Sequence, residues 1–289
     1  MSLIFDLQSH SDHSDGALAP AEVVARAAQA GVQLLALTDH DSVGGVAEAI
    51  NAGARHGVRV VAAAELSAVD GEHEDLHVLG YCIDHTDAGL LDALAGFRED
   101  RARRADRMSE ALQELGFALE DGPLRSRRAD GRPVGRPHLA QAVFDHSANA
   151  LRLHAEGLAG DPSDVLVAYL TPGAPAYRAR NTPTVSEAID VIHAAGGVAV
   201  WAHPFWDLDE PAAVVATIER FAAEGLDGVE AFYVTHDRDQ ILLLARECER
   251  RGLLTTGSAD FHGPDHQRFD RFAAFELHGM QPRLGPIAD

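Results

Sequence analysis

The sequence predicts an α/β fold in which parallel strands alternate with helices and form a barrel-like sheet. Short apolar runs rich in β-branched residues alternate with segments of helical periodicity, and glycines follow the helices. The expected strands cover residues 3–7, 34–38, 58–63, 76–83, 198–202, 228–232 and 253–256, and the expected helices cover 21–30, 43–56, 185–195, 212–224 and 238–251. Pro20 suits the first turn of the first helix, and Gly31 follows its end.

Residues 87–182 interrupt this alternation. A long charged helix is expected over 87–115, followed by a loop rich in Arg, Gly and Pro over 121–137 and by helical segments near 138–146 and 163–170. We therefore predict three parts: the first part of the barrel (1–86), a helical insertion that caps it (87–182) and the second part of the barrel (183–289).

Composition limits the classes of partner. The formal net charge of −21 disfavours long nucleic acids and anionic membranes, and no apolar run approaches the roughly 18–20 residues that span a bilayer. The two cysteines make a disulfide framework or a thiolate zinc site improbable, and no signal peptide is recognised, so we expect a cytoplasmic protein. Residues 98–136 hold ten Arg against eight acidic residues. This is either a solvated helix surface or a basic rim that attracts a small phosphorylated substrate.

Potential metal ligands follow or lie in the predicted strands. They are Gln8, His10, Asp12, His13 and Asp15 after the first strand, Asp39, His40 and Asp41 after the second, Glu65 after the third, His77 in the fourth, and His203, Glu230, His236, Asp260 and His262 after the later ones. In a parallel α/β barrel the loops after the strands gather on one face. Oxygen and nitrogen ligands without thiolates suit Zn²⁺, Mn²⁺ or Fe²⁺. The pattern predicts a metal-dependent hydrolase in which two or three cations neutralise the carboxylates and Glu65 can bridge them.

Some of these residues have simpler explanations. Asp39 could cap the following helix instead of binding metal, because Asp is a good N-cap residue. For seven other histidines we expect packed or surface positions: His56, His73, His85, His154, His193, His266 and His278.

The same residues lie in motifs that resemble those of the polymerase and histidinol phosphatase (PHP) family of metallophosphoesterases. The matching segments, in order along nearly the whole chain, are Asp6-Leu7-Gln8-Ser9-His10-Ser11, Ser14-Asp15-Gly16, Leu37-Thr38-Asp39-His40-Asp41, Ala64-Glu65-Leu66-Ser67, Leu76-His77-Val78-Leu79-Gly80, Ala202-His203-Pro204 and Ser258-Ala259-Asp260-Phe261-His262. The resemblance implies a distorted seven-stranded (β/α) TIM-like barrel with up to three metals, often Mn²⁺.

The resemblance is greatest to stand-alone bacterial members with a helical insertion, because Gly135-Arg136-Pro137-His138 and Tyr169-Leu170-Thr171-Pro172-Gly173 look like that subgroup's motifs. Similar proteins remove the 3′-phosphate of nucleoside 3′,5′-bisphosphates, and some trim short RNA from its 5′ end. The expected substrate is thus a small phosphorylated nucleotide.

Carried over position by position, the resemblance implies the metal ligands Gln8, His10, Asp15, His40, Glu65, His77, His203, Asp260 and His262. Gln8 departs from the family, whose opening motif usually has His at this position. An amide oxygen binds metal more weakly than an imidazole, so one metal position is weakened or lost.

The expected chemistry is attack on phosphorus by a metal-bound hydroxide. We assign catalytic roles to Asp260 and to His236, which could protonate the leaving oxygen. Arg136 is a candidate bidentate phosphate ligand, with His138 and Arg178 beside it, and Tyr177 could stack on a base or pack in the insertion. Two alternatives remain: a histidinol-phosphate phosphatase, and a catalytically weak metal or nucleotide sensor.

Overall fold

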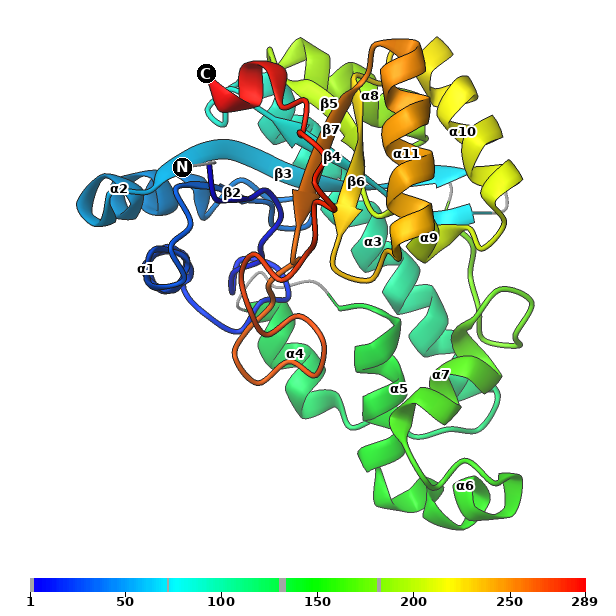
Figure 1. Cartoon of the computed structure of the whole chain (residues 1–289). Coiled ribbons are helices and arrows are strands. Elements are labelled where there is room, and N and C mark those ends of the chain that lie inside the picture. Colours follow the sequence, from blue (N-terminus) through cyan, green and yellow to red (C-terminus); the bar gives the residue numbers. More distant parts are fainter. Residues whose placement is uncertain (1–2, 72, 130–133, 181–182) are drawn as a thin grey trace. The chain divides into compact units, whose positions relative to one another are not determined.

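The computed structural model describes residues 3–71, 73–129, 134–180 and 183–289, which form two compact units (Figure 1). One unit comprises Met1–Ala95 with Pro183–Asp289, and the other comprises Gly96–Thr182. We describe each unit by itself.

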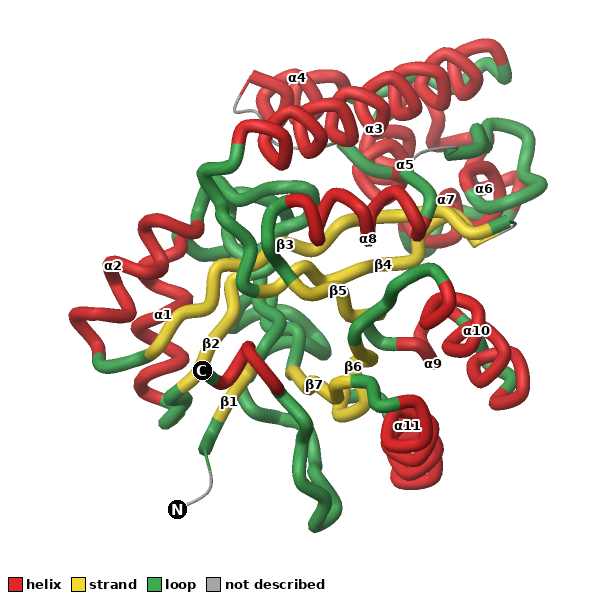
Figure 2. The backbone as a smooth tube through the Cα atoms, turned by 90° about the horizontal axis from the view of Figure 1, so that it is seen from above, coloured by secondary structure: helices red, strands yellow, loops and turns green. Residues whose placement is uncertain are grey.

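The first unit is built on a single seven-stranded sheet whose strands follow one another in chain order (Figure 2). The strands are β1 (Phe5–Asp6), β2 (Leu34–Leu37), β3 (Arg59–Asp70), β4 (His73–Tyr81), β5 (Val198–Trp201), β6 (Gly228–Tyr233) and β7 (Leu254–Ser258). The sheet curls until its edges meet: the Leu7 amide donates to the Gly257 carbonyl at 3.1 Å, and Ser9 forms a parallel bridge with Phe261. The predicted distorted seven-stranded α/β barrel is confirmed.

One strand runs against the others, which is a departure from the parallel βαβ arrangement expected where helices separate the strands. β4 pairs antiparallel with both β3 and β5. Parallel strands need a crossover of a dozen or more residues, whereas β3 continues through Asp70, turns at Gly71 (φ 59°) and leads directly into β4. This hairpin pairs Ser67 with His77 and thereby carries His77 back toward Glu65.

Helices surround the ring of strands (Figure 2). They are α1 (Pro20–Gln29), α2 (Val46–His56), α8 (Val185–Ala194), α10 (Pro211–Ala223) and α11 (Arg238–Arg251). Local signals fix their ends: Pro20 begins α1, Gly57 ends α2 at φ 71°, and Asp237 with Gln240 forms a capping box at the start of α11. Two short helices complete the unit, α9 (Pro204–Asp207) and η2 (Gly285–Ala288).

Alternate residues of the strands fill the barrel, because successive side chains of a strand point to opposite faces. The inner cluster contains Phe5, Leu7, Leu34, Ala36, Val61, Ala63, Leu79, Tyr81, Val200 and Ala202, with Leu284 and Ile287 from the C-terminal segment. The opposite face of β2 contributes Leu35 and Leu37 to a second cluster beneath α1 and α2.

The second unit is helical. It contains most of α3 (Ala88–Glu114), then α4 (Asp121–Ala129), α5 (Arg136–Asp145), η1 (Ser147–Asn149), α6 (Ala150–Glu156) and α7 (Pro162–Leu170), packed around its own apolar cluster. The predicted loop over 121–137 is partly wrong, because α4 forms there. Pro123 falls in the first turn, where proline is tolerated, and Arg125 pairs with Asp121 at 3.8 Å. Residues 130–133 of the predicted loop lie outside the described residues. Within the described chain, no helix is long and apolar enough to cross a membrane.

Candidate metal centre

Three candidate ligands extend the inward-facing rows of the barrel. In β3, Glu65 lies two residues after the inward-facing Ala63 and therefore faces the same way. In β4, His77 lies two residues before the inward-facing Leu79 and also faces inward. His40 follows β2, and its backbone forms an isolated parallel β-bridge with that of Glu65. Ligand atoms of His40, Glu65 and His77 all lie within 4.8 Å of one another. The alternation that fills the barrel with apolar side chains therefore delivers three polar ones to its mouth.

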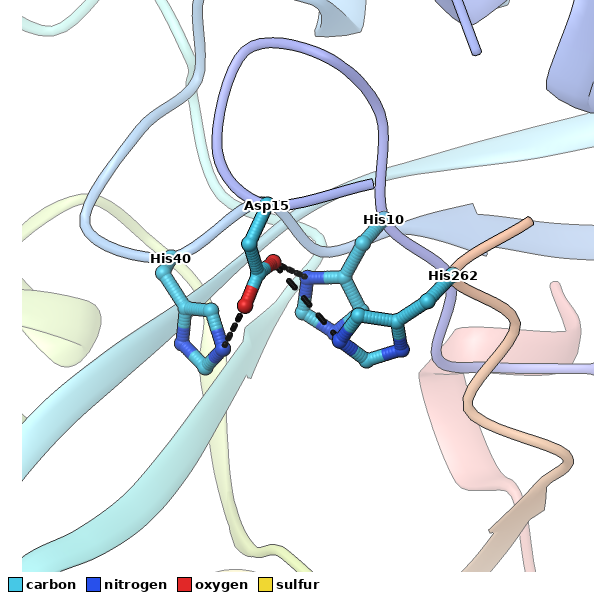
Figure 3. Close-up of side chains that lie close together, drawn as sticks. All are labelled: His10, Asp15, His40 and His262. Atoms are coloured by element: carbon cyan, nitrogen blue, oxygen red, sulfur yellow. Dashed lines mark ion pairs between the residues drawn. The ribbon is translucent and has the colours of Figure 1, made fainter. Parts of the chain in front are cut away.

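A second group joins the first at His40 (Figure 3). It consists of His10, Asp15, His40 and His262, whose ligand atoms also lie within 4.8 Å of one another. The Asp15 carboxylate is central: its oxygens lie 3.5 Å from His10 Nδ1, 3.6 Å from His40 Nε2 and 3.6 Å from His262 Nε2. These residues come from the loops that follow β1, β2 and β7.

The loop that carries Asp15 is held by Asp39. One oxygen of Asp39 accepts hydrogen bonds from the Ser11 amide at 2.7 Å and the Ser14 hydroxyl at 2.8 Å, and the other accepts from the Ser11 hydroxyl at 2.7 Å. Asp39 caps no helix, since Gly45 occupies the N-cap position of α2. Asp39 thus positions neighbouring candidate ligands, a role that the sequence analysis did not foresee.

Glu65 lies at the centre of the wider cluster and is almost fully buried. Its carboxylate oxygens lie 2.8 Å from His77 Nδ1, 3.1 Å from His10 Nε2 and 3.4 Å from His203 Nε2. Asp260, which follows β7, also contacts the His10 imidazole, with its Oδ1 3.1 Å from His10 Nε2. The predicted gathering of ligands from separate strands is therefore present in the structure.

His203 and Asp260 have left-handed backbone conformations, with φ values of 31° and 55°. Such values are uncommon for residues other than glycine and concentrate at functional sites. Buried partners fix both residues: the His203 amide donates to Glu230 at 3.1 Å, and the Tyr233 hydroxyl donates to Asp260 Oδ2 at 2.8 Å. Glu230 was noted in the sequence without a role, and Tyr233 was missed because nothing along the chain links it to Asp260.

The charges of the cluster are strongly coupled. Burial alone would raise the pKa of Glu65, but His40 and His77 hold it well below its usual range. Burial likewise opposes ionisation of Asp15, yet His40 and His262 hold its pKa well below the ordinary value. Burial lowers the pKa of His40 to about 4. Around ionised carboxylates, the protons held by imidazoles compete with any bound cation, which makes metal affinity pH-dependent.

The residues fit divalent cations. The set offers imidazole nitrogens and carboxylate oxygens without thiolates, the combination that suits Mn²⁺, Fe²⁺ or Zn²⁺. Four buried atoms, His10 Nε2, His40 Nδ1, His203 Nδ1 and Asp260 Oδ1, make no hydrogen bond of good geometry among the described residues, although His10 Nε2 lies 3.1 Å from both Glu65 and Asp260. Buried polar atoms that lack hydrogen bonds are costly, and a bound cation would satisfy ligand atoms that are crowded in this way.

Gln8 presents its nitrogen to the cluster. Its Nε2 donates to Glu65 Oε2 at 3.0 Å, and its Oε1 lies 3.4 Å from the Ser258 hydroxyl. The prediction of Gln8 as a metal ligand requires the amide oxygen to face the cluster. In this arrangement Gln8 is instead a hydrogen-bond donor that orients a candidate ligand.

His236 lies after β6, with its ring centre 5.3 Å from that of Tyr233. Its Nδ1 lies 3.2 Å from the Ala231 carbonyl, so this nitrogen carries the proton, and Nε2 has no hydrogen-bond partner among the described residues. Burial lowers the pKa of His236 to about 4. The ring is therefore neutral at pH 7, and Nε2 is ready to accept a hydrogen bond. Protonation of a leaving group by His236 remains a proposal.

This low pKa predicts a measurable loss of stability in mild acid. The unfolded His236 takes up a proton below about pH 6.5 whereas the folded one does so only near 4, so its contribution is complete above 6.5 and is lost as the pH falls through 4. Between pH 7 and pH 5 the metal-free wild type should lose about 2 kcal/mol more unfolding free energy than His236→Gln. Urea unfolding in EDTA at both pH values measures this, and equal losses would contradict it.

The predicted phosphate-binding residues lie in the second unit. Arg136 begins α5, and the His138 ring accepts a hydrogen bond from the Gly135 amide at 3.0 Å. The Arg178 guanidinium donates to the carbonyls of Tyr177 at 2.8 Å and Pro175 at 3.3 Å. Tyr177 is partly buried against the apolar cluster of the insertion, and the Arg104 guanidinium lies 5.4 Å from its ring centre. Their roles in substrate binding remain proposals.

Gly16 permits the close approach of the chain to His10. A Cβ atom at Gly16 would lie 2.3 Å from the His10 carbonyl oxygen and 2.7 Å from the Ser11 amide nitrogen, both of them backbone atoms. Gly16→Ala should therefore displace the loop that carries His10 and Asp15, lowering unfolding free energy by about 1–3 kcal/mol and weakening metal binding.

Thermal unfolding and metal titration measure this effect. Gly96→Ala is the matched control, because a Cβ atom at Gly96 meets nothing within 4 Å and alanine favours the surrounding helix α3 by up to about 1 kcal/mol. Unchanged metal affinity in Gly16→Ala would show that this close approach does not shape the centre.

The PHP domain matches residues 6–88. The 3′,5′-nucleoside bisphosphate phosphatase of Chromobacterium violaceum is 36% identical over 261 residues, covering 90% of this chain and 87% of that protein. The 5′-3′ exoribonuclease Rnm of Escherichia coli is 32% identical over 270 residues, covering 91% and 86%. A structure of a metal-dependent phosphoesterase from Bifidobacterium adolescentis superposes with a TM-score of 0.73 at 27% identity, covering 93% and 91%.

The barrel, the cluster of imidazoles and carboxylates at its mouth, and these relatives together define a metal-dependent phosphoesterase. Over nine-tenths of its length the chain shares more than 30% of its residues with such enzymes, so it belongs to the PHP family. The predicted resemblance is confirmed.

Proposed function

We propose that this enzyme hydrolyses a phosphate ester of a small nucleotide, either a nucleoside 3′,5′-bisphosphate or a short 5′-phosphorylated oligonucleotide. The observation that carries the proposal is the pair of ligand groups that share His40 at the barrel mouth. The named activities of the relatives, a nucleoside bisphosphate phosphatase and an exoribonuclease, support this substrate class.

The proposed ligands of two or three divalent ions are His10, Asp15, His40, Glu65, His77, His203, Asp260 and His262, with Gln8 contributing through Glu65 or, with its amide turned, directly. Mn²⁺ is the proposed ion, with Zn²⁺ and Fe²⁺ as alternatives. Bound ions supply charge that stabilises the phosphoryl oxygens in the transition state and lower the pKa of water.

The chain's own residues would orient the substrate and move its protons. Asp260 is held by Tyr233 and keeps one oxygen directed toward His10, which suits a catalytic role. His236 is proposed to give a proton to the leaving oxygen through Nε2, a step for which the negative charge of the bound substrate must first raise its pKa so that Nε2 is protonated. Arg136, with His138 and Arg178, is proposed to bind a second phosphate, and Tyr177 remains a candidate for contact with the base.

The acidic balance of the chain, with a net charge of −21, supports a small substrate rather than long nucleic acid. A cytoplasmic location, and independence from membranes, also remain proposals.

Phosphate release from the two monoester substrates, and mononucleotide release from the oligonucleotide, both with Mn²⁺, test the substrate assignment. Adenosine 3′,5′-bisphosphate, histidinol phosphate and a 5′-phosphorylated tetraribonucleotide would each be given to the wild type, to Gln8→His and to the matched inactive control Asp260→Ala. The proposal expects turnover of the bisphosphate or the oligonucleotide, lost in the control. Preference for histidinol phosphate would support the family's other activity. Turnover only by Gln8→His would support a sensor.

A further inference from the structure

The two tryptophans of this chain have opposite environments. Trp201 is fully buried in β5, whereas Trp206 on α9 is 51% exposed. Large aromatic rings dominate core and interface energetics, so a half-exposed tryptophan beside a candidate active site indicates a binding surface. Trp206 follows the candidate ligand His203 by three residues, and its amide donates to the His203 carbonyl at 2.8 Å. The short helix therefore ties the position of Trp206 to that of His203.

Trp206 is the outer member of a row of rings that begins at the metal centre. The Phe269 ring lies 5.5 Å from the ring of His262 and 5.9 Å from that of Trp206, so the Trp206 ring is no more than 11.4 Å from His262, the sum of the two separations. Phe269 is only 8% exposed and also lies 6.3 Å from Tyr233, which binds Asp260. The buried Phe269 ring thus packs against the exposed Trp206 ring and supports it.

A cation lies over one face of the Trp206 ring. The Arg268 guanidinium lies 5.5 Å from the centre of the Trp206 ring, within the range of a cation–π contact. An exposed indole combined with an arginine is the pairing by which proteins stack nucleobases and attract the attached phosphates. Tyr177, the aromatic candidate from the sequence, is instead partly buried in the second unit.

We propose that Trp206, supported by Phe269 and with Arg268 over one face, is a stacking platform for the nucleobase of the substrate whose phosphate is bound at the metal centre. This inference rests on the proposed nucleotide substrate. Stacking contacts the π-face that all bases share, so the platform would bind nucleotides with different bases but would not bind sugar phosphates that lack a base.

Paired substrates with and without a base test the platform. Loss of one stacked base costs about 1–3 kcal/mol, so Trp206→Ala should lower kcat/KM for adenosine 3′,5′-bisphosphate by about 5- to 150-fold. It should leave kcat/KM for ribose 3,5-bisphosphate unchanged, and Trp206→Phe should recover part of the loss. Leu151→Ala, at a residue 88% exposed on α6, is the surface control. Equal losses on both substrates, or none on either, would overturn the proposal.

Tryptophan fluorescence tests it without catalysis. Because Trp201 is buried, saturable quenching by adenosine 5′-monophosphate in Mn²⁺ should come from Trp206, disappear in Trp206→Phe and be absent with ribose 5-phosphate. Quenching that persists in Trp206→Phe, or no quenching in the wild type, would refute the platform. A wild type that is quenched by the nucleotide but hydrolyses neither the bisphosphates nor the 5′-phosphorylated oligonucleotide would retain the platform and refute the proposed reaction.

Discussion

Removal of divalent metal should abolish phosphate release and lower the melting temperature, and Mn²⁺ should restore both. Glu65, Asp15 and Asp260 lie among candidate imidazole ligands, and a cation that binds this cluster only in the folded state stabilises that state. At an Mn²⁺ concentration 100 times the Kd the gain is about 2.7 kcal/mol, or roughly 5–10 °C for a unit of this size.

Differential scanning calorimetry in EDTA and after Mn²⁺ addition, with parallel phosphate assays, measures both effects. His40→Ala should lose the Mn²⁺-dependent shift, because His40 belongs to both ligand groups. His56→Ala, at an exposed histidine of α2, should keep it. Full activity in EDTA would contradict the metal centre.

Replacement of Glu65 should lower activity strongly even when the shape of the side chain is kept. Glu65→Gln preserves shape but removes the negative charge that His10, His77 and His203 all contact. Because charge stabilisation by bound metal is worth several kcal/mol, kcat/KM should fall by at least about 10³-fold, close to 4 kcal/mol.

The metal content per chain should fall in the same variant, as measured by inductively coupled plasma mass spectrometry. Glu249→Gln, at an exposed position of α11, makes the same chemical change away from the cluster and should match the wild type. If Glu65→Gln retained more than a tenth of the activity with its full metal content, Glu65 would not be the shared centre of the site.

The arrangement of the site follows from two regularities of the chain. Alternation along β3 and β4 could be followed from Ala63 to Glu65 and from Leu79 to His77, and polar residues after other strands revealed His40, His203 and Asp260. These patterns are local, so the sequence carries them. The barrel and its candidate ligands were accordingly predictable before their contacts were known.

The features that the sequence did not reveal depend on contacts between distant segments. Tyr233 and Asp260 are 27 positions apart, and no local pattern links them. The reversed direction of β4 arises because β3 continues to Asp70, beyond the end of the strand expected at 58–63, and turns directly into β4. Helix α4 was missed because its composition, rich in Arg with Gly and Pro, is typical of loops. The side-chain orientation of Gln8 is set by Glu65, which lies 57 positions away.

An anomalous difference map of crystals soaked in Mn²⁺ would test the central claim most directly. The account predicts at least two peaks at the barrel mouth, one in contact with Asp15 and one with Glu65, each roughly 2.0–2.3 Å from imidazole nitrogen or carboxylate oxygen atoms. Crystals with no anomalous peak at His10, His40 or Glu65 would show that the cluster is a set of ion pairs and not a metal centre.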